Sequence, residues 1–185
     1  MDDIRQRLDK IPGRFANENF LSNKGLGNEV GIYVFCYAPA DEMMVRDYMQ
    51  QLKRPGENRF RIVEKDLYSV FLEICEEKRV LTSVPKMENQ RGGQYLLKEL
   101  QKIATPAAFA EKIRFKPEVP HDIVVLTGVG KVYPFMRTHN LLENLQHIFP
   151  KNPVVVMYPG TFDGQTLGLF GKFSDGNYYR AFNLI

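Results

Sequence analysis

Residues 122–126 (DIVVL), followed directly by Thr127-Gly128-Val129-Gly130, decide the fold class of this chain. A second run of the same kind, residues 153–158 (PVVVMY), leads into Pro159-Gly160. An apolar run that ends at a glycine and gives way to a helical pattern is typical of a buried parallel strand and its crossover helix. Ligands and partners bind beyond the carboxyl ends of such strands, so we expect a site where these two runs end.

Two further runs have the composition of strands. Residues 29–37 (EVGIYVFCY) are almost continuously apolar, which indicates a strand buried on both faces of a sheet. Residues 59–67 (RFRIVEKDL) alternate between apolar and charged side chains, so we expect a strand near an edge with one face in solvent. The most apolar segments, residues 30–37, 123–126 and 154–158, are expected to form the centre of the sheet.

Helical periodicity and turn residues fill the intervals between these strands. The expected helices are residues 3–11, 41–55, 68–81, 87–103, 106–115 and a last one that begins near Pro134. Residues 167–173 and 178–184 flank the turn Ser174-Asp175-Gly176-Asn177, which predicts an antiparallel hairpin. The order of elements predicts an α/β fold: a three-layer sandwich with a mostly parallel central sheet and a C-terminal antiparallel hairpin.

Length and composition favour a single domain over residues 1–185. Within it we expect an N-terminal helix and glycine-rich lead-in over residues 1–28 and a helical subregion over residues 68–116. Cys36 and Cys75 lie in apolar runs without a CxxC motif, which predicts buried, reduced thiols. The net charge of +3 is too small to indicate nucleic-acid binding by itself. An acidic start, and no apolar segment of the ~20 residues that span a bilayer, predict a cytoplasmic protein with no membrane contact.

The glycine loop, Gly128-Val129-Gly130-Lys131, invites comparison with a phosphate-binding loop. A Walker loop requires four residues between its glycines and a serine or threonine after the lysine, but here Val132 follows Lys131. The dinucleotide fingerprint also fails, because Tyr133 stands where the last glycine would be. The spacing therefore favours a tight strand-to-helix turn, and we expect no nucleotide, metal or other cofactor.

Histidine and arginine side chains gather near the start of the helix expected from Pro134. His139, Glu143 and His147 share one helix face, but the HExxH spacing is absent, so a solvated face is favoured over a metal site. Arg137 lies nearest the expected edge of the sheet. It either binds a carboxylate or phosphate group of a partner or forms an internal salt bridge, and the sequence leaves both open.

The remaining polar strings do not assemble a catalytic set. Asp163 stands in a glycine-rich turn, where aspartate commonly bonds the local backbone. In Tyr178-Tyr179-Arg180, strand alternation places Tyr179 on the opposite face from its neighbours, so one tyrosine is expected in the core. We predict no catalytic residues. The partner-binding candidates are Arg137, His139, Tyr158, Asp163, Tyr178 and Arg180, beside the glycine loop at Gly128 and Gly130.

A series of strings resembles one known family along nearly the whole chain. The strings are Phe20-Leu21, residues 24–30 (KGLGNEV), 127–130 (TGVG), Tyr133-Pro134, Arg137 with His139, 158–160 (YPG) with Asp163-Gly164, 169–171 (LFG) and 177–182 (NYYRAF). They occur in the order found in the BrxB family. The chain is therefore similar to a component of bacterial BREX phage-defence systems.

The resemblance implies that the protein is a small component that functions together with larger BREX subunits. These are a PglZ-type phosphatase-like protein, an AAA-type ATPase and a DNA methyltransferase. It brings no established reaction and no catalytic residues. With no complete catalytic constellation in the sequence, it favours a non-enzymatic assembly or adaptor subunit. A DNA-contacting module using Arg137 and Arg180, with direct or indirect DNA association, and a nucleotide-binding domain with a nonstandard loop stay open as alternatives, as does self-association.

Overall fold

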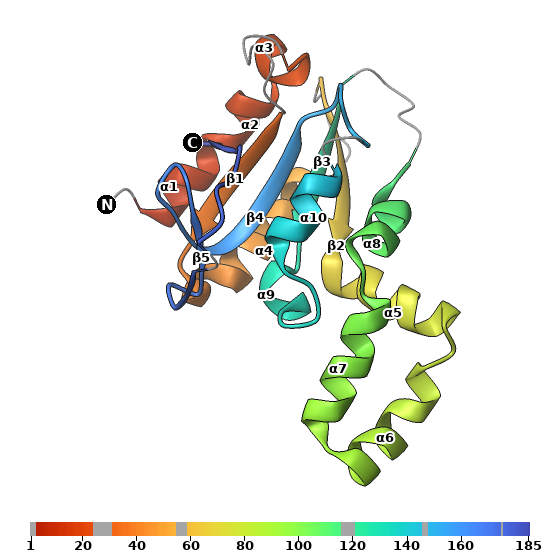
Figure 1. Ribbon diagram of the computed structural model, residues 1–185. Coiled ribbons are helices and arrows are strands. Elements are labelled where there is room, and N and C mark those ends of the chain that lie inside the picture. Colours follow the sequence, from red (N-terminus) through yellow and green to blue (C-terminus); the bar gives the residue numbers. More distant parts are fainter. Residues whose placement is uncertain (1–2, 24–30, 55–58, 116–120, 146–147, 175) are drawn as a thin grey trace.

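The structure is a computed structural model of the 185-residue chain. It describes residues 3–23, 31–54, 59–115, 121–145, 148–174 and 176–185. A parallel sheet with the strand order β2-β3-β4-β1-β7 forms the middle layer (Figure 1). Its strands are β1 (Ile32–Tyr37), β2 (Arg61–Asp66), β3 (Asp122–Thr127), β4 (Val154–Phe162) and β7 (Phe182–Asn183). The predicted α/β fold with a mostly parallel central sheet is confirmed.

The three most apolar strands lie inside the sheet, as predicted. β4 pairs with β1 on one side and β3 on the other, with Val156 opposite both Val34 and Leu126. These side chains are almost fully buried because helices cover both faces of the sheet. β2 lies at the edge beside β3, as its alternating pattern predicts.

Four N-terminal helices cover one face of the sheet (Figure 1). They are α1 (Ile4–Asp9), α2 (Ile11–Phe15), α3 (Glu18–Leu21) and α4 (Glu42–Leu52), the last preceded by the short helix η1 (Pro39–Asp41). Aromatic rings bind this layer to β1. Phe20 stacks on Phe15 with ring centroids 5.5 Å apart and contacts Tyr33 at 4.7 Å.

Helices from the middle of the chain lie on the other side of the sheet. They are α5 (Leu67–Glu77), η2 (Leu81–Ser83), α6 (Val84–Arg91), α7 (Gly93–Ile103), α8 (Pro106–Ile113), α9 (Val129–Val132) and α10 (Thr138–Leu145). The helix expected over residues 87–103 is divided at Gly92, whose φ of 82° is unsuited to a helix interior. The resulting pair, α6 and α7, projects away from the sheet (Figure 1).

The helix expected from Pro134 begins later than predicted. Gly128 takes a left-handed conformation, and α9 starts immediately after it. Residues 134–137 then connect α9 to α10, and the ring of Phe135 stacks on Phe71 of α5 with centroids 4.4 Å apart. Leu141, Leu142 and Leu145 are nevertheless buried on one face of α10, as the periodicity predicts.

The C-terminal antiparallel hairpin is present, but its second arm differs from the predicted one. β5 (Leu167–Leu169) pairs with the end of β4 and with β6 (Phe173–Ser174). The chain reverses early because Phe170 and Gly171 both have a positive φ, of 56° and 65°. The segment expected as the second arm, residues 178–184, instead brings β7 parallel to β1, with Phe182 opposite Tyr33. Asp175 of the predicted turn lies outside the described residues.

Candidate docking surface

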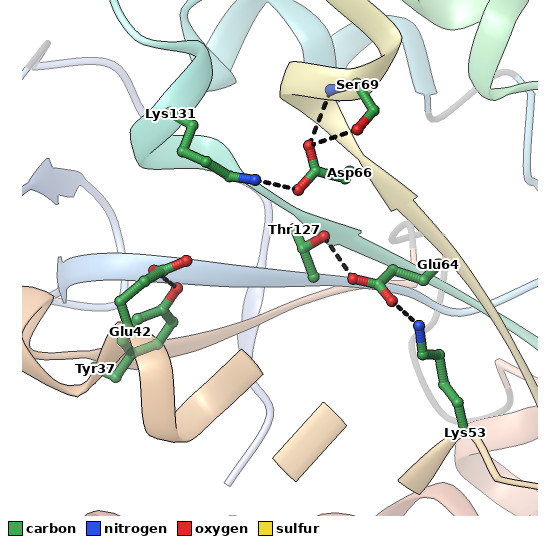
Figure 2. A network of polar contacts seen from close by, with 8 residues as sticks. All are labelled: Tyr37, Glu42, Lys53, Glu64, Asp66, Ser69, Thr127 and Lys131. Atoms are coloured by element: carbon green, nitrogen blue, oxygen red, sulfur yellow. Dashed lines mark hydrogen bonds and ion pairs between the residues drawn. The ribbon is translucent and has the colours of Figure 1, made fainter. Parts of the chain in front are cut away.

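A polar network joins the carboxyl ends of β2 and β3 (Figure 2). Asp66, the last residue of β2, caps α5 by accepting a hydrogen bond of 2.9 Å from the amide of Ser69. The ammonium group of Lys131 in α9 donates to the other carboxylate oxygen of Asp66 at 2.6 Å. Burial raises the pKa of Asp66, but the bonds from Lys131 and Ser69 outweigh burial and hold the pKa below its usual range. The network thus ties α9 to the start of α5.

Both glycines of the loop have a packing role. At Gly128, φ is 74°, and an added Cβ would lie 3.0 Å from the Asp66 carboxylate. At Gly130, an added Cβ would lie 2.8 Å from the ring of Phe170 and 3.3 Å from Pro159. Glycine at these positions lets the loop contact β2 on one side and the β5–β6 hairpin on the other. Close packing explains the two glycines of the loop, and the ion pair with Asp66 explains Lys131.

The same edge carries three further polar contacts that sequence reasoning missed (Figure 2). The Thr127 hydroxyl donates to Glu64 at 2.8 Å, and Glu64 also pairs with Lys53 just after α4. The Tyr37 hydroxyl donates to Glu42 at 2.6 Å. Burial, followed by this hydrogen bond, raises the pKa of Tyr37 far above its usual value. All these groups are paired internally, so the network stabilises this edge of the sheet.

Tyr179, a buried side chain, lines two neighbouring cavities. The first, of about 410 Å³, lies between α10 and the segment that leads into β7. The second, of about 200 Å³, lies among the α9–α10 connection, the end of β4 and the β5–β6 hairpin. We define the Tyr179 surface as Tyr179 with the polar and aromatic residues of both cavities. They are His139, Glu143, Tyr178 and Arg180 in the first, and Tyr133, Arg137, Thr138, Tyr158, Lys172 and Phe173 in the second.

Five predicted candidates fall on the Tyr179 surface. Arg137 and Tyr158 line the second cavity together, although Tyr158 lies within β4 and not beyond its end. Arg137 is exposed, whereas Tyr158 is buried and forms part of the cavity floor. The other three, His139, Tyr178 and Arg180, line the first cavity.

Side-chain exposure in the first cavity follows the predicted alternation. Tyr178 is 63% exposed and Arg180 is exposed, whereas Tyr179 between them is only 4% exposed. His139 lies on the helix side, with Nε2 3.4 Å from Glu143 and its ring 5.1 Å from that of Tyr179. The cavity therefore combines a buried aromatic floor with exposed polar groups at its mouth.

Asp163 lies apart from these residues, in the turn between β4 and β5. Its carboxylate accepts hydrogen bonds from the amides of Gln165 and Thr166, at 2.8 and 2.6 Å, and from the Thr166 hydroxyl. The bonds from the Thr166 amide and hydroxyl, then from Gln165, lower the pKa of this exposed carboxyl. Asp163 is thus engaged in shaping its own turn. Lys172 and Asp163 border a further small cavity beside the second one.

Among the described residues, no three histidine, cysteine, aspartate or glutamate side chains are arranged to hold a metal ion. His147 lies outside that part of the chain. Nor does any helix there have the length and apolar character needed to cross a bilayer.

The structure is that of an α/β protein with helices on both faces of a parallel sheet. Two neighbouring cavities share the buried side chain of Tyr179. The model of the family described as BREX protein BrxB matches residues 63–184. The chain belongs to the BrxB family, and it is a component of a BREX phage-defence system.

Curated relatives extend the match over nearly the whole chain. A protein described as BREX protein BrxB from Bacillus cereus (strain H3081.97) is 43% identical over 189 residues, covering 98% of this chain and 97% of the relative. A second, with the same description, from Escherichia coli O9:H4 (strain HS), is 31% identical over 183 residues, covering 98% and 92%. No solved structure matches the chain. The family description gives no catalytic activity.

Proposed function

We propose that this protein is a non-enzymatic assembly or adaptor subunit of its BREX system, working in the cytoplasm through protein–protein contacts. Its partners are other BREX subunits: the PglZ-type phosphatase-like protein, the AAA-type ATPase or the methyltransferase complex. The Tyr179 surface is the contact site. Family membership supports the assignment to BREX, and the composition of the Tyr179 surface supports docking.

One observation carries this proposal. The Tyr179 surface brings two exposed arginines, Arg137 and Arg180, together with two exposed aromatic side chains, Tyr178 and Phe173. Tyr178 is 63% and Phe173 is 49% exposed, although both are large enough to pack in a core. Tyrosine and arginine are enriched among the residues that contribute most to protein interfaces, and such residues cluster in pockets. The surface has the composition of a docking site.

The polar network at the sheet edge weakens the nucleotide-binding alternative. A phosphate loop uses a free lysine and backbone amides that wrap the phosphates. Here Lys131 binds Asp66 at 2.6 Å, and Gly130 packs beneath Phe170. DNA contact through Arg137 and Arg180 is also less favoured, because Glu143 lines the same cavity as Arg180 and opposes a continuous basic track.

We predict that Arg137→Ala reduces phage protection while leaving the fold intact. Arg137 is exposed and has no ion pair within the described part of the chain, so its removal leaves no buried charge unpaired. Loss of an arginine anchor from an interface costs about 2 kcal/mol, which is roughly thirtyfold in affinity. Phage plating efficiency and the melting temperature of purified protein are the two measurements.

The matched control is Arg54→Ala, an exposed arginine just after α4 on the opposite face of the sheet. It should leave both plating efficiency and melting temperature at the level of the unmodified protein. A large drop in melting temperature for Arg137→Ala would show that Arg137 holds the fold together. Full protection at an unchanged melting temperature would remove Arg137 from the docking site.

A further inference from the structure

The second cavity of the Tyr179 surface is positively charged. Arg137 and Lys172 both line it, and among the residues that the structure describes no carboxylate does. Both side chains are exposed, and neither forms an ion pair with any residue that the structure describes. Arginine and lysine in this setting attract a carboxylate, and arginine binds one through two parallel hydrogen bonds. The rim of the cavity therefore suits an acidic group.

Part of the lining of the same cavity is apolar. Val129, Met136 and Leu169 contribute buried side chains to its lining. The rings of Tyr133 and Phe173 lie 5.2 Å apart at 31° to one another, and Phe173 is half exposed. Concave sites with an apolar lining and a few charged groups at the mouth bind ligands that combine both characters. An apolar side chain would fit inside while a neighbouring carboxylate meets the two cations.

Carboxylates on either side restrict the ligand further. Glu143 lines the first cavity, which shares Tyr179 with the second, and Asp163 lines the small cavity that shares Lys172. Nucleic-acid binders track a phosphate backbone along an extended basic groove with stacked aromatic side chains. A cationic region bounded by acidic groups favours a short acidic segment of protein over a long polyphosphate chain.

We propose that the second cavity binds an acidic peptide segment of another BREX subunit. An apolar side chain of that segment packs against the paired rings of Tyr133 and Phe173, and flanking aspartate or glutamate residues pair with Arg137 and Lys172. This inference rests on the proposed function and adds the chemistry of the partner: an exposed acidic segment with an apolar residue in its middle.

A peptide array tests this chemistry. Overlapping synthetic peptides that tile the other BREX subunits of the same operon, and this chain itself, are probed with purified full-length protein. The bound peptides should carry an apolar residue flanked by carboxylates. Arg137→Glu and Lys172→Glu should each weaken their binding by more than about tenfold, because each reverses a contact charge. Arg54→Glu, the matched charge reversal on the other face, should leave binding unchanged.

Several results would overturn the proposal: no bound peptides, neutral or basic ones only, or binding that survives both charge reversals. Selective binding of this chain's own peptides would identify a second copy as the occupant. A labelled single-stranded DNA oligonucleotide that binds the unmodified protein and is lost in the same two variants would identify nucleic acid. Capture of the intact subunits in parallel separates the two claims. If the intact subunits are captured but no peptide binds, only the proposed acidic-peptide ligand is excluded. If no intact subunit is captured, the adaptor function is excluded as well.

Discussion

Replacing Arg61 with leucine is expected to lower the free energy of unfolding by about 3 kcal/mol, because it leaves a buried carboxylate unpaired. Asp122, at the start of β3, is fully buried. Its two carboxylate oxygens accept hydrogen bonds from Nε and Nη2 of Arg61, at 2.8 and 2.7 Å. Arg61 keeps part of its side chain in water, at 43% exposure, so the loss falls mainly on Asp122. Urea denaturation followed by circular dichroism measures the difference.

Arg59→Leu is the matched control, because Arg59 is also exposed and lies two residues before Arg61. It should change stability by less than about 0.5 kcal/mol. The double variant Arg61→Leu/Asp122→Leu should regain part of the loss, since replacing both partners of a buried pair removes the unpaired charge. An Arg61→Leu protein as stable as the Arg59→Leu control would show that the pair does not stabilise β2 against β3.

Gly160→Ala is expected to cost about 2–3 kcal/mol and to loosen the β5–β6 hairpin, because it overpacks the junction of β4 and β5. An added Cβ would overlap the backbone carbonyl oxygen of Gly168 and lie 2.9 Å from the ring of Tyr158. A backbone atom in a paired strand cannot rotate away as a side chain can. Urea denaturation gives the loss in stability, and amide hydrogen exchange reports the opening of β5.

Gly13→Ala serves as the control, because nothing lies within 4 Å of a Cβ added there. It should leave exchange in β5 unchanged. If Gly160→Ala shows the same stability and the same exchange as that control, β5 is not held against β4 as described. The second cavity would then lack one of its walls, because Leu169 of β5 lines it.

The sequence predicted the sheet well because burial on both faces leaves a direct mark on composition. Residues 123–126 and 154–158 are continuous apolar runs, and both became internal strands. The C-terminal hairpin was predicted with the wrong second arm for a local reason. Its reversal uses a positive φ at Phe170 and Gly171, but phenylalanine rarely adopts this conformation, and the run Ser174-Asp175-Gly176-Asn177 gave a stronger turn signal.

Much of the site could not be predicted, because its contacts join residues that are far apart in the sequence. Asp66 and Lys131 are 65 residues apart, and Glu64 and Thr127 are 63 apart, so no local pattern reveals either pair. Asp66 did carry one usable signal, as an aspartate directly before a helical pattern with a serine three residues on. Arg137 was found because strand direction places it beyond the sheet.

The remaining residues of the second cavity had no comparable signal. Lys172 and Phe173 reach it through the β5–β6 turn, whose position the sequence did not indicate. Tyr133 stands in a family string and departs from the dinucleotide fingerprint, and neither feature places it in a cavity. It lines the cavity because α9 ends immediately before it. Only the tertiary structure shows that residues next to α9, in β4 and in the β5–β6 hairpin line one cavity.

We propose that the Tyr179 surface docks this protein onto another BREX subunit, and co-purification measures that docking. Affinity-tagged protein is expressed with the other subunits of its operon, treated with nuclease, captured and quantified by mass spectrometry. The unmodified protein and Arg54→Glu should retain at least one other subunit, and Arg137→Glu should retain less than about a tenth as much. Equal recovery by Arg137→Glu, or recovery of no BREX subunit by the unmodified protein, would contradict the proposal.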